Sequence, residues 1–217
     1  MNTPARTPTL FVSTSCYRTP GARAQAFGTN VLRALGWADG SRVCITEDNP
    51  WLPVARAQMA LAFLDTACEA WLMRDEDVTF GPGVVKALWA LDAPAAVAPY
   101  LVRKDPTRFE TIVGPDGDAL FAGCGAMLVR RPWIEALWKR HYDELHFRHM
   151  GRVHVALFRD IFAQRDDGRA LLHEDHAFCW RLRDEGARIA VLHGHAVAHA
   201  GQPAAYPNVP SPPGVAP

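Results

Sequence analysis

The sequence predicts a single α/β domain in which helices flank a mixed, mostly parallel central sheet. Over the first hundred residues, short apolar stretches alternate with amphipathic ones, which is the pattern of the strand–helix–strand units that build parallel sheets. The length of 217 residues is that of one ordinary domain. A content of 49% hydrophobic and 21% charged residues is typical of a chain that buries a core and folds alone.

In the first half of the chain, apolar and β-branched runs predict strands, and apolar residues at helical spacing predict helices. The expected strands cover residues 10–15, 42–46 and 70–73, and the expected helices cover residues 20–35, 53–66 and 84–91. Pro20 suits a first helical turn, and Gly36 is a typical stop for the helix before it. These elements predict successive crossover units.

The second half has more aromatic residues, and we place the end of the domain in it. Further strands are expected over residues 95–102, 109–113, 120–129, 188–192 and 195–197, and helices from Pro132 onward and over 153–164 and 174–185. Gly123 and Gly125 inside an expected strand predict that another group approaches the backbone closely. The domain covers residues 1–202, and the prolines of residues 203–217 predict an extended tail.

Charge and cysteine usage argue against several classes of protein. Lys plus Arg number 23, as do Asp plus Glu, so no net charge favours a nucleic acid or a membrane surface as partner. Five cysteines without CxxC spacing argue against a disulfide framework or a cysteine-bound zinc. We find neither a signal peptide nor the ~20 apolar residues of a membrane-spanning helix. We therefore expect a soluble, cytoplasmic protein.

Polar residues end two of the expected strands, at the sheet edge where open α/β sheets bind ligands. Thr14 and Ser15 end the first strand and would contact a nucleotide or simply form a turn. Asp75-Glu76-Asp77 follows the third strand. Carboxylates at i and i+2 of an extended backbone project to one side, where a cation would relieve their repulsion. Oxygen ligands suit Mg²⁺ or Mn²⁺, and a solvated acidic turn is the alternative.

Other polar residues are candidates for binding or catalysis. Glu174 and Asp175 open an expected helix, where they would cap free amides or supply a general base. Histidines 193, 195 and 199 alternate along an extended segment, and we expect one of them to be a metal ligand. Arg56 on its helix would hold a diphosphate or solvate the surface. Glycine-rich phosphate loops of the Walker or dinucleotide type are absent, as is GxSxG.

Taken in order, these motifs resemble those of the nucleotide-sugar-dependent glycosyltransferases of the GT-A fold, from the first strand to about Gln202. STSCYR (13–18) resembles the nucleotide-binding opening, LPVARAQ (52–58) the arginine-bearing helix, and WLMRDEDVTF (71–80) the strand with the metal-binding DxD motif. APYLVRKD (98–105) and FAGCGAMLVRRPW (121–133) resemble acceptor-side strands. HEDHAFCWRLRDEG (173–186) resembles the acidic helix start and AVAHAG (196–201) the late histidine. The resemblance implies a GT-A-like, Rossmann-like domain.

The resemblance also implies roles for single residues. Those that would bind the nucleotide sugar are Thr14, Ser15, Arg18, Arg56, Asp75 and Glu76. Those that would hold Mn²⁺ or Mg²⁺ are Asp75, Asp77 and His199. Asp175, or Glu174 beside it, would be the catalytic base that deprotonates the acceptor if the reaction inverts.

The predicted function is therefore that of a metal-dependent glycosyltransferase of the hexosyltransferase type. Its donor would be a nucleotide-diphosphate sugar, with a UDP-sugar favoured, and its acceptor a hydroxyl of a glycan, a protein, a small molecule or a hydroxymethylated base in phage-type DNA. A nucleotidyltransferase of similar fold is a second hypothesis, although the Gly- and Lys/Arg-rich N-terminal sequence expected to hold a triphosphate is missing. A non-catalytic nucleotide- or glycan-binding module is the third. The sequence indicates no oligomeric state.

Overall fold

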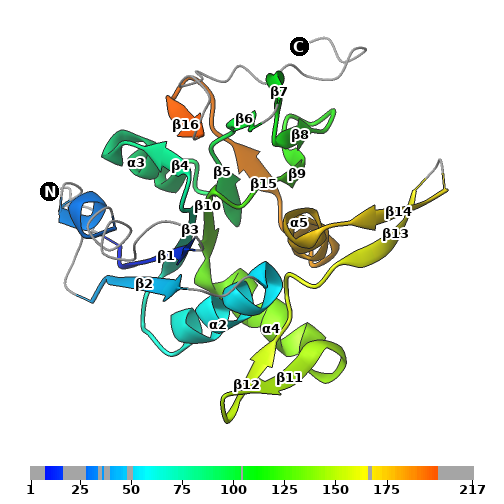
Figure 1. Ribbon diagram of the computed structural model, residues 1–217. Coiled ribbons are helices and arrows are strands. Elements are labelled where there is room, and N and C mark those ends of the chain that lie inside the picture. Colours follow the sequence, from blue (N-terminus) through cyan, green and yellow to red (C-terminus); the bar gives the residue numbers. More distant parts are fainter. Residues whose placement is uncertain are drawn as a thin grey trace, which may run out of the picture.

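The computed structural model describes residues 8–16, 28–33, 36, 40–47, 51–103, 105–165 and 168–199. Within these ranges a six-stranded sheet is covered by helices and accompanied by five two-stranded ribbons (Figure 1). The predicted α/β class is confirmed. Residues 28–33 are helical, as expected, while the start of the expected 20–35 helix, Arg18 and the 203–217 tail lie outside the described residues.

The central sheet is mixed and mostly parallel, as predicted. Its strands, in spatial order, are β15 (Ile189–Val191), β5 (Ala95–Val97), β10 (Ala126–Arg130), β3 (Ala70–Asp75), β1 (Leu10–Cys16) and β2 (Arg42–Glu47). β1 lies parallel to both β2 and β3, and β15 lies parallel to β5. β10 alone runs antiparallel to its neighbours β3 and β5.

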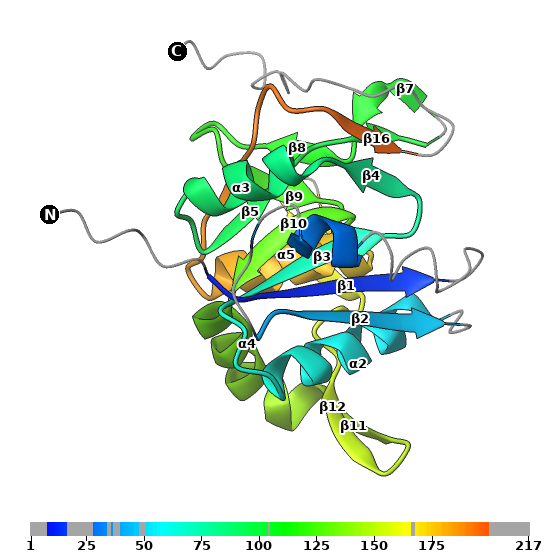
Figure 2. The same cartoon turned by 90° about the vertical axis from the view of Figure 1, so that its left-hand side faces the viewer.

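The two faces of the sheet bury alternate side chains of the same strands, because successive residues of a strand point to opposite faces. Phe11 and Trp71 belong to a core that includes side chains of α2 (Leu52–Leu64), α4 (Arg131–Leu145) and α5 (Glu174–Asp184). Leu10 and Leu72 pack into a second core with α3 (Pro82–Ala90). Figure 2 shows α2 and α4 on one side of β1 and β2, and α3 on the other.

Five antiparallel ribbons border the sheet. They are β4 (Val78–Phe80) with β16 (Val197–His199), β6 (Leu101–Val102) with β7 (Asp105–Phe109), β8 (Thr111–Val113) with β9 (Ala119–Ala122), β11 (His146–His149) with β12 (Arg152–Val155), and β13 (Ile161–Arg165) with β14 (Gly168–Leu172). In the first ribbon His199 lies opposite Val78. This pairing brings the end of the described chain next to the acidic turn after β3.

The helix expected over residues 153–164 is wrong, because this segment contributes to two ribbons. Met150 and Gly151 have positive φ angles of 49° and 75° and let β12 fold back on β11. Gly168, at φ 122°, closes β13 on β14. The apolar residues of this segment are spaced as in a helix, but pairing with neighbouring strands determines its conformation.

Two expected strands are each divided in the structure. The stretch 120–129 is interrupted at residues 123–125, so that β9 pairs with β8 while β10 joins the central sheet. The stretch 95–102 forms β5 and β6, which also belong to different sheets. All five cysteines are free thiols, as expected. Among the described residues we find no helix whose length and hydropathy would suit a membrane span.

Candidate active site

The candidate site lies where β1 and β3 end. Ser15 pairs in register with Asp75, and Thr14 pairs with Arg74. Thr14 is only 2% exposed, whereas Ser15 is half-buried. Of the two hydroxyls expected to bind a nucleotide, that of Ser15 is therefore the more accessible one beside the acidic residue.

A buried arginine on α2 joins two predicted motifs that are far apart in the sequence. Arg56 is 3% exposed. Its Nη2 donates to Oδ1 of Asp75 at 3.0 Å, and its Nη1 forms an ion pair with Oδ1 of Asp175. Burial lowers the pKa of Arg56, but the carboxylate of Asp75 and other acidic groups raise it, and the net direction is upward. Arg56 is therefore a permanent cation that holds the end of β3 beside the start of α5.

Both carboxylate oxygens of Asp175 have a partner within the chain. Oδ1 pairs with Arg56, and Oδ2 accepts a hydrogen bond of 3.1 Å from the backbone N–H of Cys124. Burial raises the pKa of the Cys124 thiol to about 12, so this side chain is neutral. Glu174 is half-buried, and its side chain makes no hydrogen bond or ion pair with any residue that the structure describes. Of the two candidate bases, the side chain of Asp175 therefore has partners on both oxygens, and that of Glu174 has none among the described residues.

The backbone around Gly123 and Gly125 is approached closely by other groups, as the sequence predicted. Gly125 donates its N–H to Tyr100 Oη at 3.1 Å. A Cβ atom on Gly125 would lie 2.7 Å from that oxygen and 2.9 Å from Oδ2 of Asp75. Burial, together with the negative charge of Asp75, raises the pKa of Tyr100 well above its ordinary value. The neutral phenol of Tyr100 and the backbone of Gly125 therefore pack next to the carboxylate of Asp75.

Asp77 faces a different partner from Asp75. Its Oδ2 lies 3.2 Å from Nε2 of His199 and 3.6 Å from Nη1 of Arg103, whose side chain is 58% exposed. Nδ1 of His199 lies 2.8 Å from the carbonyl oxygen of Leu101, which can only accept, so Nδ1 carries the proton. Nε2 is then the ring nitrogen that faces the carboxylate of Asp77.

This pair of side chains fits a divalent cation. Adjacent ligands of an octahedral ion with bonds of about 2.1 Å lie about 3.0 Å apart, close to the 3.2 Å between Asp77 Oδ2 and His199 Nε2. The carboxylate suits Mn²⁺ or Mg²⁺, and the binding of either ion here stays a prediction. Among the described residues, Asp75, Asp77 and His199 do not form a group whose ligand atoms all lie within 4.8 Å of one another, so a shared metal site of these three stays a prediction. Of the three alternating histidines only His199 contacts Asp77, since Nδ1 of His195 instead contacts the carbonyl oxygen of His193.

A second arginine shapes the acidic turn between β3 and β4. Arg74 is 7% exposed, and burial lowers its pKa against the opposing effect of nearby acidic groups. Its Nε donates to the carbonyl oxygen of Val78 at 2.7 Å, and its Nη2 donates to that of Glu76 at 3.1 Å. The guanidinium therefore spans the turn that carries Glu76 and Asp77.

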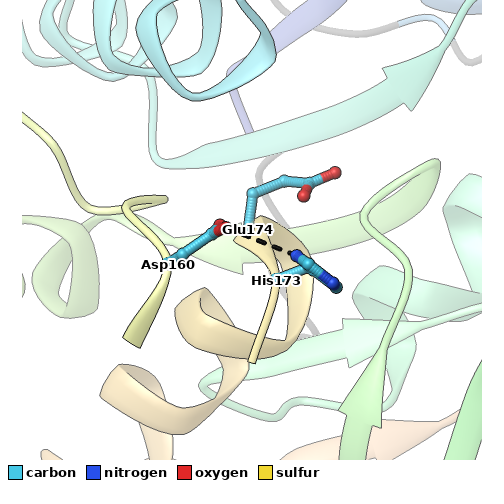
Figure 3. Close-up of side chains that lie close together, drawn as sticks. All are labelled: Asp160, His173 and Glu174. Atoms are coloured by element: carbon cyan, nitrogen blue, oxygen red, sulfur yellow. Dashed lines mark hydrogen bonds and ion pairs between the residues drawn. The ribbon is translucent and has the colours of Figure 1, made fainter. Parts of the chain in front are cut away.

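Asp160, His173 and Glu174 form a further group whose ligand atoms lie within 4.8 Å of one another (Figure 3). Nδ1 of His173 lies 3.3 Å from Oδ2 of Asp160, and their side chains are 72% and 45% exposed. Asp160 precedes β13 and His173 follows β14, so this contact closes the base of that ribbon. It also ties the connection before β13 to the start of α5.

Sequence reasoning missed several residues around this site. Tyr100, Glu110 and Asp160 belong to no chemical motif, and only Tyr100 lies in a segment that resembled an acceptor-side strand. Burial raises the pKa of Glu110. Arg108 and His199 lower this pKa, whereas the negative charges of Asp75 and Glu174 raise it. Glu110 therefore belongs to the same electrostatic environment as the predicted site residues, although no local pattern distinguishes it.

Comparisons with known proteins give limited similarities. No family model matches the chain, and no curated protein matches it. Among solved structures, an inositol-1-phosphate CTP transferase from T. maritima is 14% identical, with a TM-score of 0.44 over 90% of this chain and 70% of that chain. A glycosyltransferase involved in the glycosylation of the major capsid of PBCV-1 is 10% identical, with a TM-score of 0.38 over 63% of this chain and 69% of that chain. Because both TM-scores are below 0.5, the functional argument rests on this chain's own residues.

Proposed function

We propose that this protein is a metal-dependent glycosyltransferase that moves a sugar from a nucleotide-diphosphate donor, with UDP favoured, to an acceptor hydroxyl. The observation that carries the proposal is the buried Arg56, which binds the carboxylates of both Asp75 and Asp175. It gathers, at one sheet edge, the acidic strand end and the acidic helix start that the resemblance assigns to donor and acceptor. The contact between Asp77 and His199 supports the proposal that these two side chains bind a metal ion.

The proposed chemistry separates a diphosphate from a sugar while a hydroxyl attacks the anomeric carbon. Asp77 and His199 would hold Mn²⁺, and a bound divalent cation supplies Lewis-acid stabilisation of the charge on the departing diphosphate. Arg103 lies beside Asp77 and is exposed, so its guanidinium can turn toward the same phosphate oxygens. Ser15 and Asp75 would contact the nucleoside and the sugar.

For an inverting reaction, Glu174 is the better candidate for the base. Asp175 already forms an ion pair with Arg56 and accepts a hydrogen bond from the Cys124 N–H, and these contacts orient its carboxylate. Glu174 lies next to it without such partners among the described residues. A proton acceptor needs an available lone pair aimed at the acceptor hydroxyl. We therefore assign proton removal to Glu174 and a positioning role to Asp175, which reverses the preference that the sequence suggested.

The test is a thermal-shift and hydrolysis screen of the full chain with UDP-, GDP- and CDP-sugars, with and without Mn²⁺. We expect Mn²⁺-dependent stabilisation by one donor and slow release of the nucleoside diphosphate. Asp77→Asn should abolish both responses. The matched control is Asp143→Asn on the exposed side of α4, which should leave both unchanged.

Other outcomes would redirect the assignment. The absence of any response to a nucleotide sugar would refute the proposal and leave the acidic triplet as a solvated turn. Release of pyrophosphate from CTP or UTP with a sugar 1-phosphate would identify a nucleotidyltransferase instead. Donor binding without turnover in the presence of any acceptor would indicate a binding module.

A further inference from the structure

A cavity of about 320 Å³ lies between the start of α2 and the segment that leads into β13. It is lined mainly by apolar side chains, among them Trp51, Val54 and Phe147, with Arg159 and Asp160 as its charged members. Trp51 is 72% exposed, which makes it the most exposed of the tryptophans that the structure describes. The volume is at the lower end of the ~300–1,000 Å³ that is usual for small-molecule sites.

The charged side of this cavity is held in place by a buried side chain. Arg181 on α5 is 4% exposed, and its Nη1 donates to the carbonyl oxygens of Leu157 at 2.9 Å and Arg159 at 2.8 Å. These bonds fix the backbone that carries Arg159 and Asp160. The cavity wall is therefore preorganised, a property that reduces the entropic cost of binding.

The cavity adjoins the candidate base. Asp160 lines the cavity and also contacts Nδ1 of His173, the residue directly before Glu174 (Figure 3). A molecule in this cavity would therefore lie beside the acidic start of α5, on the side of Asp160.

From this placement we infer that the cavity is the acceptor subsite and that the acceptor is a glycan, bound through a pyranose ring. This inference rests on the proposed transferase function. A pyranose has an apolar C–H face, which packs on an exposed indole such as that of Trp51, and a rim of hydroxyl groups. Arg159 offers donors and Asp160 offers acceptors to that rim.

The inference is tested by saturation-transfer NMR on the full chain, with methyl β-D-glucopyranoside, methyl β-D-galactopyranoside and methyl α-D-mannopyranoside as probes. We expect transfer to the ring C–H protons of at least one glycoside. Trp51→Ala should raise its dissociation constant about tenfold, as the loss of one aromatic contact would. Trp51→Leu, which keeps apolar bulk without the flat ring, should have a similar effect and serves if the alanine variant does not fold.

The control variant is Phe162→Ala, because Phe162 is an aromatic residue with similar exposure, at 66%, that is not among the residues lining this cavity. It should leave glycoside binding unchanged. The inference is overturned if none of the three glycosides receives saturation, or if both Trp51 variants bind them as the wild type does. It is also overturned if the Trp51 variants lose UDP binding instead, since the cavity would then hold the donor base.

This test can fail independently of the proposed function. Slow hydrolysis of the nucleotide sugar needs no acceptor, so hydrolysis by the wild-type protein tests the proposed function alone, and glycoside binding tests the acceptor subsite alone. Hydrolysis with no glycoside binding would refute only the acceptor subsite. Glycoside binding without any nucleotide response would refute the transferase and identify a sugar-binding site alone.

Discussion

Replacing Arg56 with methionine is the sharpest test of how the site is held together. The variant removes a cation that is 3% exposed and leaves the carboxylates of Asp75 and Asp175 facing each other without it. Removing one partner of a buried ion pair costs about 3–5 kcal/mol. The two carboxylates are 28% and 20% exposed, so water can partly solvate them. We therefore expect the lower end, about 3 kcal/mol.

The assay is thermal and urea unfolding followed by circular dichroism. For a chain of this length, about 3 kcal/mol corresponds to a fall in Tm of about 6–12 °C. Arg140→Met is the matched control, because Arg140 is 46% exposed and pairs with Asp184 and Glu185 at the surface. Surface ion pairs are worth about 1 kcal/mol or less, so its Tm should fall by only a few degrees.

A double-mutant cycle separates the ion pair from packing. Asp175→Asn removes one of the charges that Arg56→Met leaves uncompensated, so the double variant should be more stable than the sum of the two single changes allows. The reasoning would be refuted if Arg56→Met were no more destabilising than Arg140→Met. Strict additivity in the cycle would equally contradict the described contact.

Three further predictions concern stability. Gly125→Ala places a Cβ atom 2.9 Å from Oδ2 of Asp75 and should cost about 1–3 kcal/mol in urea unfolding, whereas Gly81→Ala, with no atom within 4 Å, should be nearly neutral. Burial lowers the pKa of His176 below its ordinary value, so the contribution of His176 to stability should be full at pH values well above that ordinary pKa and should be lost as the pH falls below it, and urea unfolding at several pH values should show that His176→Asn flattens this decline. Arg74→Leu deprives two turn carbonyls of their donor and should cost about 1–3 kcal/mol by the same unfolding assay.

Local sequence patterns correctly predicted the helices and strands whose apolar residues repeat regularly along the chain. The apolar runs of β1 and β3 and the apolar face of α4 are visible in the chain, because strands buried on both faces are continuously apolar and a helix that packs on one side repeats its apolar residues every 3.6 positions. The position of the acidic triplet at a strand end followed from the same reasoning. The segment 153–164 was predicted wrongly because its apolar spacing fits a helix, while its conformation depends on pairing with β11 and β14.

By itself, the sequence determined the fold class and the place of Asp75 and Asp77 at the end of a buried strand. Only the tertiary structure decided that Asp75 binds Arg56 while Asp77 contacts His199. It also brought Asp160 to His173 beside the candidate base. The physical reason is that hydrophobic periodicity is a property of neighbouring residues, whereas the partner of a charged side chain is set by which strand ends and helix starts meet at one edge of the sheet.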